Sequence, residues 1–470
     1  MRVCLLTTCL CTMLAAGCAL VDPPEGISTL PEPHPGTLAQ DGPGLSASGA
    51  VGGVEHEGPW KLQECIQTGL ENNPDLAAAK WDVRSAEESR NVARAAAMPD
   101  LSIEGSYGDY VNAQPLTPVV GNPRAVVATD DIVEGHLRLQ MPLYTGGRIR
   151  NNIAAAELLR MASRGALART RRELVFNISS IFYDILARRH VIESLKSNRR
   201  ALKQHLEQVK ALIANERATK VDRLRTEVRL ADVRQELADA RNTIRTRRHA
   251  LATLMGIRNA DEPLQVKGNL EFDETTLPDA EAALEAARKR RADYRSLRAK
   301  VEAQKRRVGA ARAELWPTLS LQASYGDRWD ASDMSTPEDV GNAGVGLSLP
   351  LFEGGRIRAD VRKQVAELES SRQRLRKLRL QIRLEVRTAL NNVSSARERV
   401  QATNKAIQQA KESLRTQRLR YRNGKASVTD VLDAQSGLLE SQKNYYRALA
   451  AWNTARSELR LATGRNPRES

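Results

Sequence analysis

Apolar and polar side chains alternate over four short stretches of the chain, which come in two pairs. In the first stretch Leu101, Ile103 and Tyr107 share one face, and polar side chains share the other. A period of two residues predicts β-strands. The four stretches cover about residues 100–110, 133–144, 318–328 and 342–352. Strands of about ten residues with one apolar and one polar face are typical of a membrane β-barrel. The alternative is a soluble hairpin that rests on helices.

The aromatic residues favour the membrane interpretation. Only 4% of the chain is aromatic, yet the rings gather in or beside the predicted strands. They are Tyr107, Tyr110, Tyr144, Trp316, Tyr325, Trp329 and Phe352. Girdles of aromatic side chains mark the two membrane interfaces of a β-barrel. The connections at about 111–132 and 329–342 contain Pro, Gly, Asn and Asp, and we predict them to be exposed loops.

Long stretches of helical periodicity follow the two strand pairs. Residues 148–213 and 356–423 carry apolar side chains at spacings of three, four and seven, which is typical of coiled coils. Each stretch predicts a helix about 100 Å long at 1.5 Å per residue. Helices of about half that length are predicted to stack in pairs beside them, over residues 61–98, 220–254, 278–315 and 428–461. Pro74 is expected to divide the first of these.

The sequence is internally duplicated. Pro-Leu-Tyr-Thr-Gly-Gly-Arg-Ile-Arg at 142–150 recurs as Pro-Leu-Phe-Glu-Gly-Gly-Arg-Ile-Arg at 350–358. In each copy, proline and Gly-Gly end a strand pattern and a helix pattern begins. The duplicated unit is helix–strand–strand–helix–helix. It predicts a first repeat at 60–256, a junction at 257–278, a second repeat at 279–464 and a tail at 465–470.

The N-terminal residues predict export. Residues 1–17 are typical of a secretory signal peptide, because Arg2 precedes an apolar run that ends in small residues. Residues 14–18, Leu-Ala-Ala-Gly-Cys, resemble a bacterial lipobox, which implies lipidation of Cys18. The alternative is an ordinary signal with a chance cysteine. Residues 18–59 are rich in Pro, Gly and Ser and predict a flexible, lipid-anchored linker.

Four membrane strands cannot form a closed wall, because the outer two leave backbone groups unpaired in lipid. Small closed barrels begin near eight strands, so the chain is expected to oligomerise. A homotrimer with twelve strands is the simplest closure. The predicted fold is therefore mainly α with a membrane β-barrel portion, in which a trimeric barrel continues into a long coiled-coil α-barrel.

Three motifs carry a resemblance to a known family. They are the two Pro-Leu-[Tyr/Phe]-x-Gly-Gly-Arg-Ile-Arg copies, the Asn-Pro-Asp-Leu at 73–76, and the Tyr-Arg-Asn-Gly-Lys-Ala-Ser-Val-Thr-Asp-Val-Leu-Asp-Ala at 421–434. Over residues 60–464 the chain resembles the TolC-like outer membrane efflux proteins. The resemblance implies a channel in the outer membrane of a Gram-negative bacterium, extending into the periplasm. Such a channel docks a periplasmic adaptor and an inner-membrane pump, and exports small molecules. Type I protein secretion uses the same fold and stays an alternative.

The resemblance also implies roles for residues at the two helix turns. Asp430 and Asp433 match the acidic ring of the periplasmic entrance, where converging carboxylates select cations or form a constriction. Tyr421 and Asp222 match gate contacts. Small or polar residues at the adaptor-docking tips are Ala218, Thr219, Gly424 and Ser427.

One position departs from the family pattern. Ala426 stands where the best-studied members have an arginine that helps to lock the entrance. Lys425 and Arg225 are the candidate replacements.

The remaining features do not indicate an enzyme. The net charge of +15 is spread among acidic residues along the helices, which favours a solvated surface. A basic coiled coil that binds nucleic acid is an alternative, and the predicted export signal argues against it. After processing, Cys18 and Cys65 are too few for a disulfide framework or a zinc site, and the six histidines lack ligand spacing. We therefore expect no metal or cofactor. The alternative from another class is a lipid-anchored periplasmic coiled-coil scaffold, which predicts no membrane strands.

Overall fold

The computed structural model describes residues 58–118, 126–257, 264–273, 277–331 and 338–465. The predicted signal peptide, Cys18 and the linker up to residue 57 lie outside the described residues. Across the part of the chain that is described, no helix combines the length and apolarity needed to span a membrane.

Eight helices of the described chain form two matching sets of four. The first set is α2 (Leu62–Asn72), α3 (Pro74–Ala95), α4 (Arg148–Ala214) and α5 (Lys220–Met255); the second is α6 (Ala280–Arg290), α7 (Ala292–Ala313), α8 (Arg356–Arg422) and α9 (Val428–Thr463). Helices in corresponding positions have equal lengths of 11, 22, 67 and 36 residues. The predicted duplication and the two long helices are confirmed.

One helix break was not predicted. Pro74 marks the break between α2 and α3, but residues 278–315 were expected to form one helix. Instead Arg291 has an extended backbone between α6 and α7, with φ −69° and ψ 124°. No proline marks this break. Its cause is a set of polar contacts described below.

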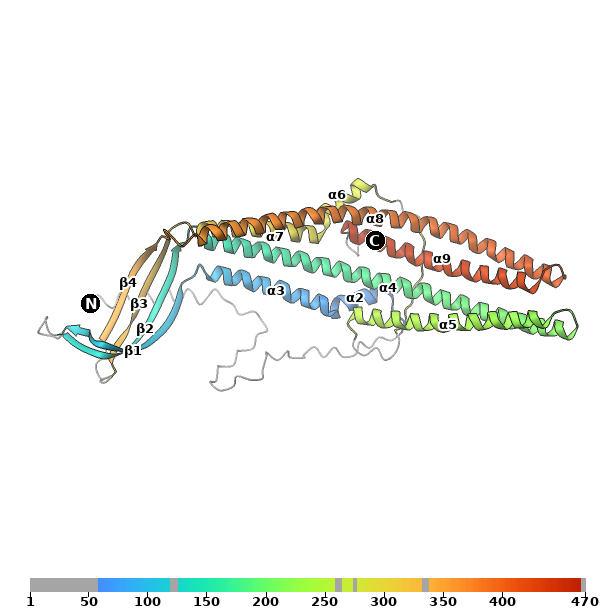
Figure 1. Ribbon diagram of the computed structural model, residues 1–470, viewed down its shortest axis with the longest axis horizontal. Helices are drawn as coiled ribbons and strands as arrows, with labels where there is room; N and C mark the ends of the chain where they lie inside the picture. Colours follow the sequence, from blue (N-terminus) through green and yellow to red (C-terminus); the bar gives the residue numbers. More distant parts are fainter. Residues whose placement is uncertain (1–57, 119–125, 258–263, 274–276, 332–337, 466–470) are drawn as a thin grey trace. The chain divides into compact units, whose positions relative to one another are not determined.

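The four strands form one antiparallel sheet in the order β1-β2-β3-β4 (Figure 1). They are β1 (Asp100–Pro118), β2 (Val126–Tyr144), β3 (Thr318–Asp330) and β4 (Glu338–Ser348). Within the described chain, β1 and β4 each pair along one side only, so both outer edges of the sheet are open. The apolar face is uncovered as well, and Ile103 is 84% and Leu347 is 70% exposed.

The strands differ in length from the prediction. β1 and β2 have 19 residues each, so much of the predicted loop at 111–132 is strand. A register shift between Asp109 and Gln114 lets the backbone pairing continue past the irregular sequence. β3 and β4 likewise extend into the predicted loop at 329–342. β4 ends at Ser348 rather than near residue 352, and Pro350, which has no N–H to donate, follows.

The two Gly-Gly pairs join strand to helix as predicted. Gly147 and Gly355 are the N-cap residues of α4 and α8, with φ of 89° and 83°. The preceding glycines, Gly146 and Gly354, also have positive φ. Two consecutive left-handed residues are costly for any side chain except glycine, so the repeated pair fixes where each long helix begins.

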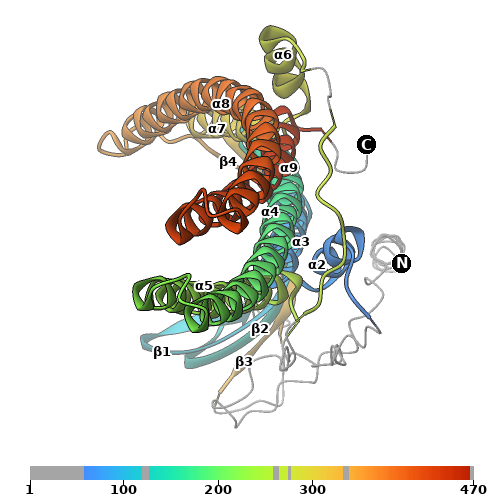
Figure 2. The ribbon, with the colours of Figure 1, turned by 90° about the vertical axis from the view of Figure 1, so that its right-hand side faces the viewer.

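The helices pack as two long hairpins with the shorter helices beside them. Hairpin 1 is α4 with α5, and hairpin 2 is α8 with α9; α9 also packs against α4, and α7 packs against both α4 and α8 (Figure 2). The largest apolar core joins α2, α4, α5 and α9. Near the junction, Trp60 pairs with Val266, and both are buried.

Candidate functional site

Both hairpins end in turns with the same capping geometry. At the start of α5, the Asp222 backbone N–H donates to Thr219 Oγ1 (3.2 Å), and Asp222 Oδ2 accepts from the Thr219 N–H (3.0 Å). Ser427 and Asp430 repeat these contacts at the start of α9, at 3.2 and 2.8 Å. Each pair is a capping box, which satisfies backbone donors that have no partner in the first helical turn.

The capping box determines the state of the Asp430 carboxylate. The backbone N–H and then the hydroxyl of Ser427 lower the pKa of Asp430, so this exposed group is ionised at neutral pH. Asp433 lies one turn further along α9 and is also exposed. The structure therefore places both predicted entrance residues at the exposed start of α9. Asp430 additionally has a structural task that the sequence analysis missed.

The two predicted gate residues lie near each other without a mutual hydrogen bond among the described contacts. Burial, and then the charge of Asp222, raise the pKa of the half-buried Tyr421. The Asp222 carboxylate is occupied by Thr219. The ring of Tyr421 meets the ring of His205 on α4 edge-on, with 5.6 Å between centroids. Tyr421 thus contacts hairpin 1 from hairpin 2.

A row of polar contacts connects the two hairpins, and we call it the hairpin seam. Arg225 donates to Thr429 Oγ1 (2.7 Å), and Arg229 Nε donates to Ser436 Oγ (2.9 Å). The other members of the seam are the bond of Gln435 to Asn198 (2.6 Å), the ion pair of Lys443 with Glu236 (3.3 Å), the stacked rings of His190 and Tyr446, and the His205–Tyr421 contact. Of the two candidate replacements for the missing arginine, Arg225 thus bridges the hairpins.

The predicted docking tips are small and mostly exposed. Gly424 has φ 69°, and a Cβ at this position would have open space around it. Thr219 and Ser427 are exposed capping residues, whereas Ala218 is half-buried against the core. Their exposure leaves room for a partner at the turns.

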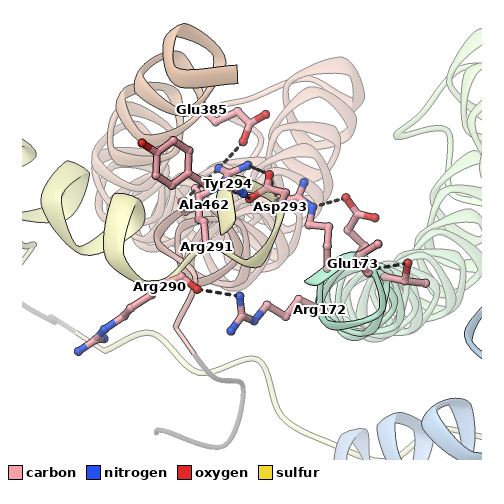
Figure 3. A network of polar contacts seen from close by, with 11 residues as sticks. Arg172, Glu173, Arg290, Arg291, Asp293, Tyr294, Glu385 and Ala462 are labelled. Atoms are coloured by element: carbon pink, nitrogen blue, oxygen red, sulfur yellow. Dashed lines mark hydrogen bonds and ion pairs between the residues drawn. The ribbon is translucent and has the colours of Figure 1, made fainter. Parts of the chain in front are cut away.

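A second polar cluster was not predicted from the sequence, because its members are far apart in the chain. Arg291 is 1% exposed; it donates to Asp293 (2.6 and 3.1 Å), to Glu385 on α8 (2.5 Å) and to the carbonyl of Ala462 on α9 (3.3 Å) (Figure 3). These contacts hold the break between α6 and α7 against α8 and α9. They explain why the helix is interrupted there without proline.

The duplication contains the signal that could have found Arg291. Asn73 occupies the equivalent position between α2 and α3; it caps α3 and donates to the carbonyl of Leu254 (2.9 Å). Leu254 and Ala462 are equivalent positions of α5 and α9. Both halves therefore anchor the end of their last helix to the break between their first two helices, through an amide in one half and a guanidinium in the other.

No metal site emerges from the described residues, which contain no cluster of three or more His, Cys, Asp or Glu side chains suited to a metal ion. A cavity of about 1080 Å³ lies between the hairpins. It is lined by both signs of charge, including Asp184, Glu236, Arg399 and Lys443. This arrangement resembles a solvated groove more than a reaction site.

Comparison with known proteins gives matches over most of the chain. The family model described as "Outer membrane efflux protein" matches residues 65–257 and 283–465. Nodulation protein T of Rhizobium leguminosarum bv. trifolii is 23% identical over 86% of this chain and 85% of its own length. Outer membrane efflux protein BepC of Brucella suis is 25% identical over 90% of each chain. The crystal structure of the Campylobacter jejuni CmeC outer membrane channel superposes with a TM-score of 0.76 at 18% identity, covering 86% of this chain and 85% of that one.

Proposed function

Because the chain belongs to the outer membrane efflux protein family, we propose that it is the outer membrane channel of a tripartite efflux system. In this role it forms an exit duct for small molecules that extends from the outer membrane into the periplasm. The observation that carries the proposal is the four-stranded sheet with two open edges and an uncovered apolar face.

Closure of the sheet requires further copies of the chain. An open edge in lipid leaves backbone N–H and C=O groups unpaired, at several kcal/mol per group. Three copies joined from β4 to β1 make twelve strands, enough for a barrel with a lumen. The proposed active form is therefore a homotrimer, with the α-helical hairpins forming the duct below the barrel.

The turns of the hairpins form the periplasmic entrance in this proposal. Three copies of Asp430 and Asp433 converge there, and their carboxylates constrict the path and favour cations. Asp222 and Tyr421 are gate contacts. Since Ala426 cannot supply the family's arginine, we assign the lock to Arg225 and Arg229, which bond hairpin 1 to hairpin 2.

Partners and anchoring complete the proposal. A periplasmic adaptor docks at the tips formed by Ala218, Thr219, Gly424 and Ser427, and an inner-membrane pump drives export. Cys18 carries the lipid that anchors the chain in the outer membrane of a Gram-negative bacterium. The small residues at the tips support close approach of a partner helix.

The test is the current through the purified protein in a planar lipid bilayer. We expect trimers in detergent and small, cation-selective currents from the parent protein. Replacing both Asp430 and Asp433 by Ala should reduce cation selectivity. A protein that is monomeric and soluble without detergent contradicts the channel.

The lock is tested separately in the same bilayers. The double variant Arg225→Ala with Arg229→Ala should increase the current several-fold, because each broken bond to a charged donor is worth about 1.5–3 kcal/mol. Arg223→Ala is the matched control, since Arg223 pairs with Glu227 on its own helix. Equal currents from the double variant and the control would reject the assigned lock but leave the channel proposal intact.

A further inference from the structure

A small cavity of about 70 Å³ lies between α2, α4 and α9, close to the C-terminal end of α9. Its polar lining consists mainly of Arg172 and Tyr183 from α4, Arg460 from α9, and Arg465 just beyond α9. Apolar side chains such as Leu62 and Phe176 form the rest of the wall. We call this space the arginine cavity. It belongs neither to the hairpin seam nor to the turns.

The arginine cavity has an unbalanced positive charge. No Asp or Glu side chain lines it. Within the described chain, none of its three arginines forms an ion pair, whereas neighbouring arginines do. Arg456 pairs with Asp273 (3.0 Å), and Arg169 pairs with Glu173. The carboxylates of Asp273 and Glu173 are therefore committed to arginines outside the cavity.

Burial and like charge both act on Arg172. Burial, followed by the charge of Arg295, lowers the pKa of the Arg172 guanidinium. One of its N–H groups donates to the backbone carbonyl of Arg290 (3.2 Å), which holds the side chain in place (Figure 3). A guanidinium has five N–H donors, so further donors remain for a ligand.

Two serines and a tyrosine also line the arginine cavity, and they differ in whether they can donate to a ligand. Ser179 and Ser457 donate their hydroxyl hydrogens to carbonyls of their own helices, at 2.7 and 3.0 Å. The half-buried Tyr183 has a phenol whose pKa is raised by burial, so it stays protonated and can donate. Guanidinium and phenol donors suit an acceptor-only ligand with several oxygens.

We propose that the arginine cavity binds a small oxyanion group, phosphate or carboxylate, held by Arg172, Arg460 and Arg465. The cavity is small, about 70 Å³, which suits a single such group. Because the donors come from α4 and from the end of α9, a bound anion ties these helices together. This is a binding site separate from the exit duct and independent of cargo.

The experiment measures anion binding to the full-length protein in detergent at constant ionic strength. Sodium phosphate, sodium acetate and sodium chloride are titrated in parallel. For each salt, the apparent melting temperature is measured, and binding is measured by titration calorimetry. We expect phosphate or acetate to raise the melting temperature above the chloride series and to bind saturably. A larger effect of phosphate assigns the site to phosphate groups, and a larger effect of acetate assigns it to carboxylates.

Variants identify the site. Arg172→Gln with Arg460→Gln should weaken the binding constant at least tenfold, and Arg460→Lys should weaken it by less because charge is kept while the planar fork is lost. Arg447→Gln, on the same helix but in the larger groove, should bind like the parent. If the double variant does not fold, Arg460→Lys and Arg465→Gln carry the test. Binding that is unchanged in these variants, or stabilisation by chloride equal to that by phosphate and acetate, overturns the proposal.

Discussion

Replacing Arg291 by Met should loosen the place where α6, α7, α8 and α9 meet. The substitution keeps the length of the side chain but removes its charge and its donors. The Arg291 side chain is 2% exposed, that of Asp293 is 20% exposed and that of Glu385 is 44% exposed. Burial alone raises the pKa of Asp293, yet the hydrogen bonds and the charge of Arg291 lower it overall. The variant therefore leaves a largely buried carboxylate whose remaining ion pair is the longer one to Arg169, at 3.7 Å.

The expected loss of stability depends on how far each carboxylate can be rehydrated once Arg291 is removed. Removing one partner of a buried ion pair costs about 3–5 kcal/mol. Glu385 is nearly half exposed and can return to water, so its bond adds less than about 1 kcal/mol. We therefore expect Arg291→Met to lower the local free energy of unfolding by about 3 kcal/mol, the low end of that range, and Glu385→Gln to lower it by less than about 1 kcal/mol.

Hydrogen exchange measured by mass spectrometry resolves this loss locally. A change of about 3 kcal/mol corresponds to roughly 100-fold faster exchange, at a factor of ten per 1.4 kcal/mol. The affected peptides should cover the break at Arg291 and the end of α9, whereas the turns of the hairpins should be unchanged. Unaltered protection in Arg291→Met, or a larger effect in Glu385→Gln, would falsify the assignment of Arg291 as the anchor.

Three further predictions concern the turns and the glycines. Acidification should weaken the hairpin seam, because the pKa of His205 is lowered by burial and then by the charge of Arg418, and Gln208 raises it less. The neutral His205 therefore contributes to stability fully above its unfolded pKa of about 6.5. This stability is lost as the pH falls toward the lowered pKa of the folded state. After correction for the intrinsic exchange rate at each pH, the amides around Tyr421 should be less protected at pH 5 than at pH 7.5. This difference should disappear in His205→Gln and persist in His190→Gln, whose imidazole faces Glu193. Persistence in both variants contradicts the assignment. Gly256→Ala should lower the melting temperature more than Gly354→Ala. Both glycines have positive φ, which costs an alanine about 1–2 kcal/mol, but only at Gly256 would the new Cβ lie 2.3 Å from the carbonyl oxygen of Asn72. Equal decreases in melting temperature would show that a small shift of the backbone relieves this contact. Ser427→Ala should destabilise the start of α9 by about 1 kcal/mol, measured as faster amide exchange there. Unchanged exchange would mean that the bond from the Ser427 backbone N–H to Asp430 caps the helix without the hydroxyl.

The helices and their order could be predicted because local signals mark them. Gly-Gly pairs start α4 and α8, Pro74 starts α3, and Gly256 and Gly464 end α5 and α9 in the left-handed conformation. Each signal acts on the residue that carries it, so no knowledge of distant contacts is needed.

The missed features depend on distant contacts. The break at Arg291 is fixed by Glu385 and Ala462, which come from other helices. The bond of Arg225 to Thr429 joins residues that are 204 positions apart. The strand ends were wrong because backbone pairing, with a register shift after Asp109, continues where side-chain alternation fades. Residue types alone do not specify these partners.

In the proposed homotrimer, the open edges of β1 and β4 are paired only when separate chains meet, so the last stage of folding is bimolecular or higher in order. The contacts between the two helices of each hairpin come from one chain. The sheet, however, finds partners for its edges only when copies meet, so the rate of completion should rise with the density of chains at the membrane. A chain that waits at the membrane exposes the unpaired edges of β1 and β4, which can aggregate. We therefore expect low expression to slow the association of chains more than it reduces the stability of the closed barrel.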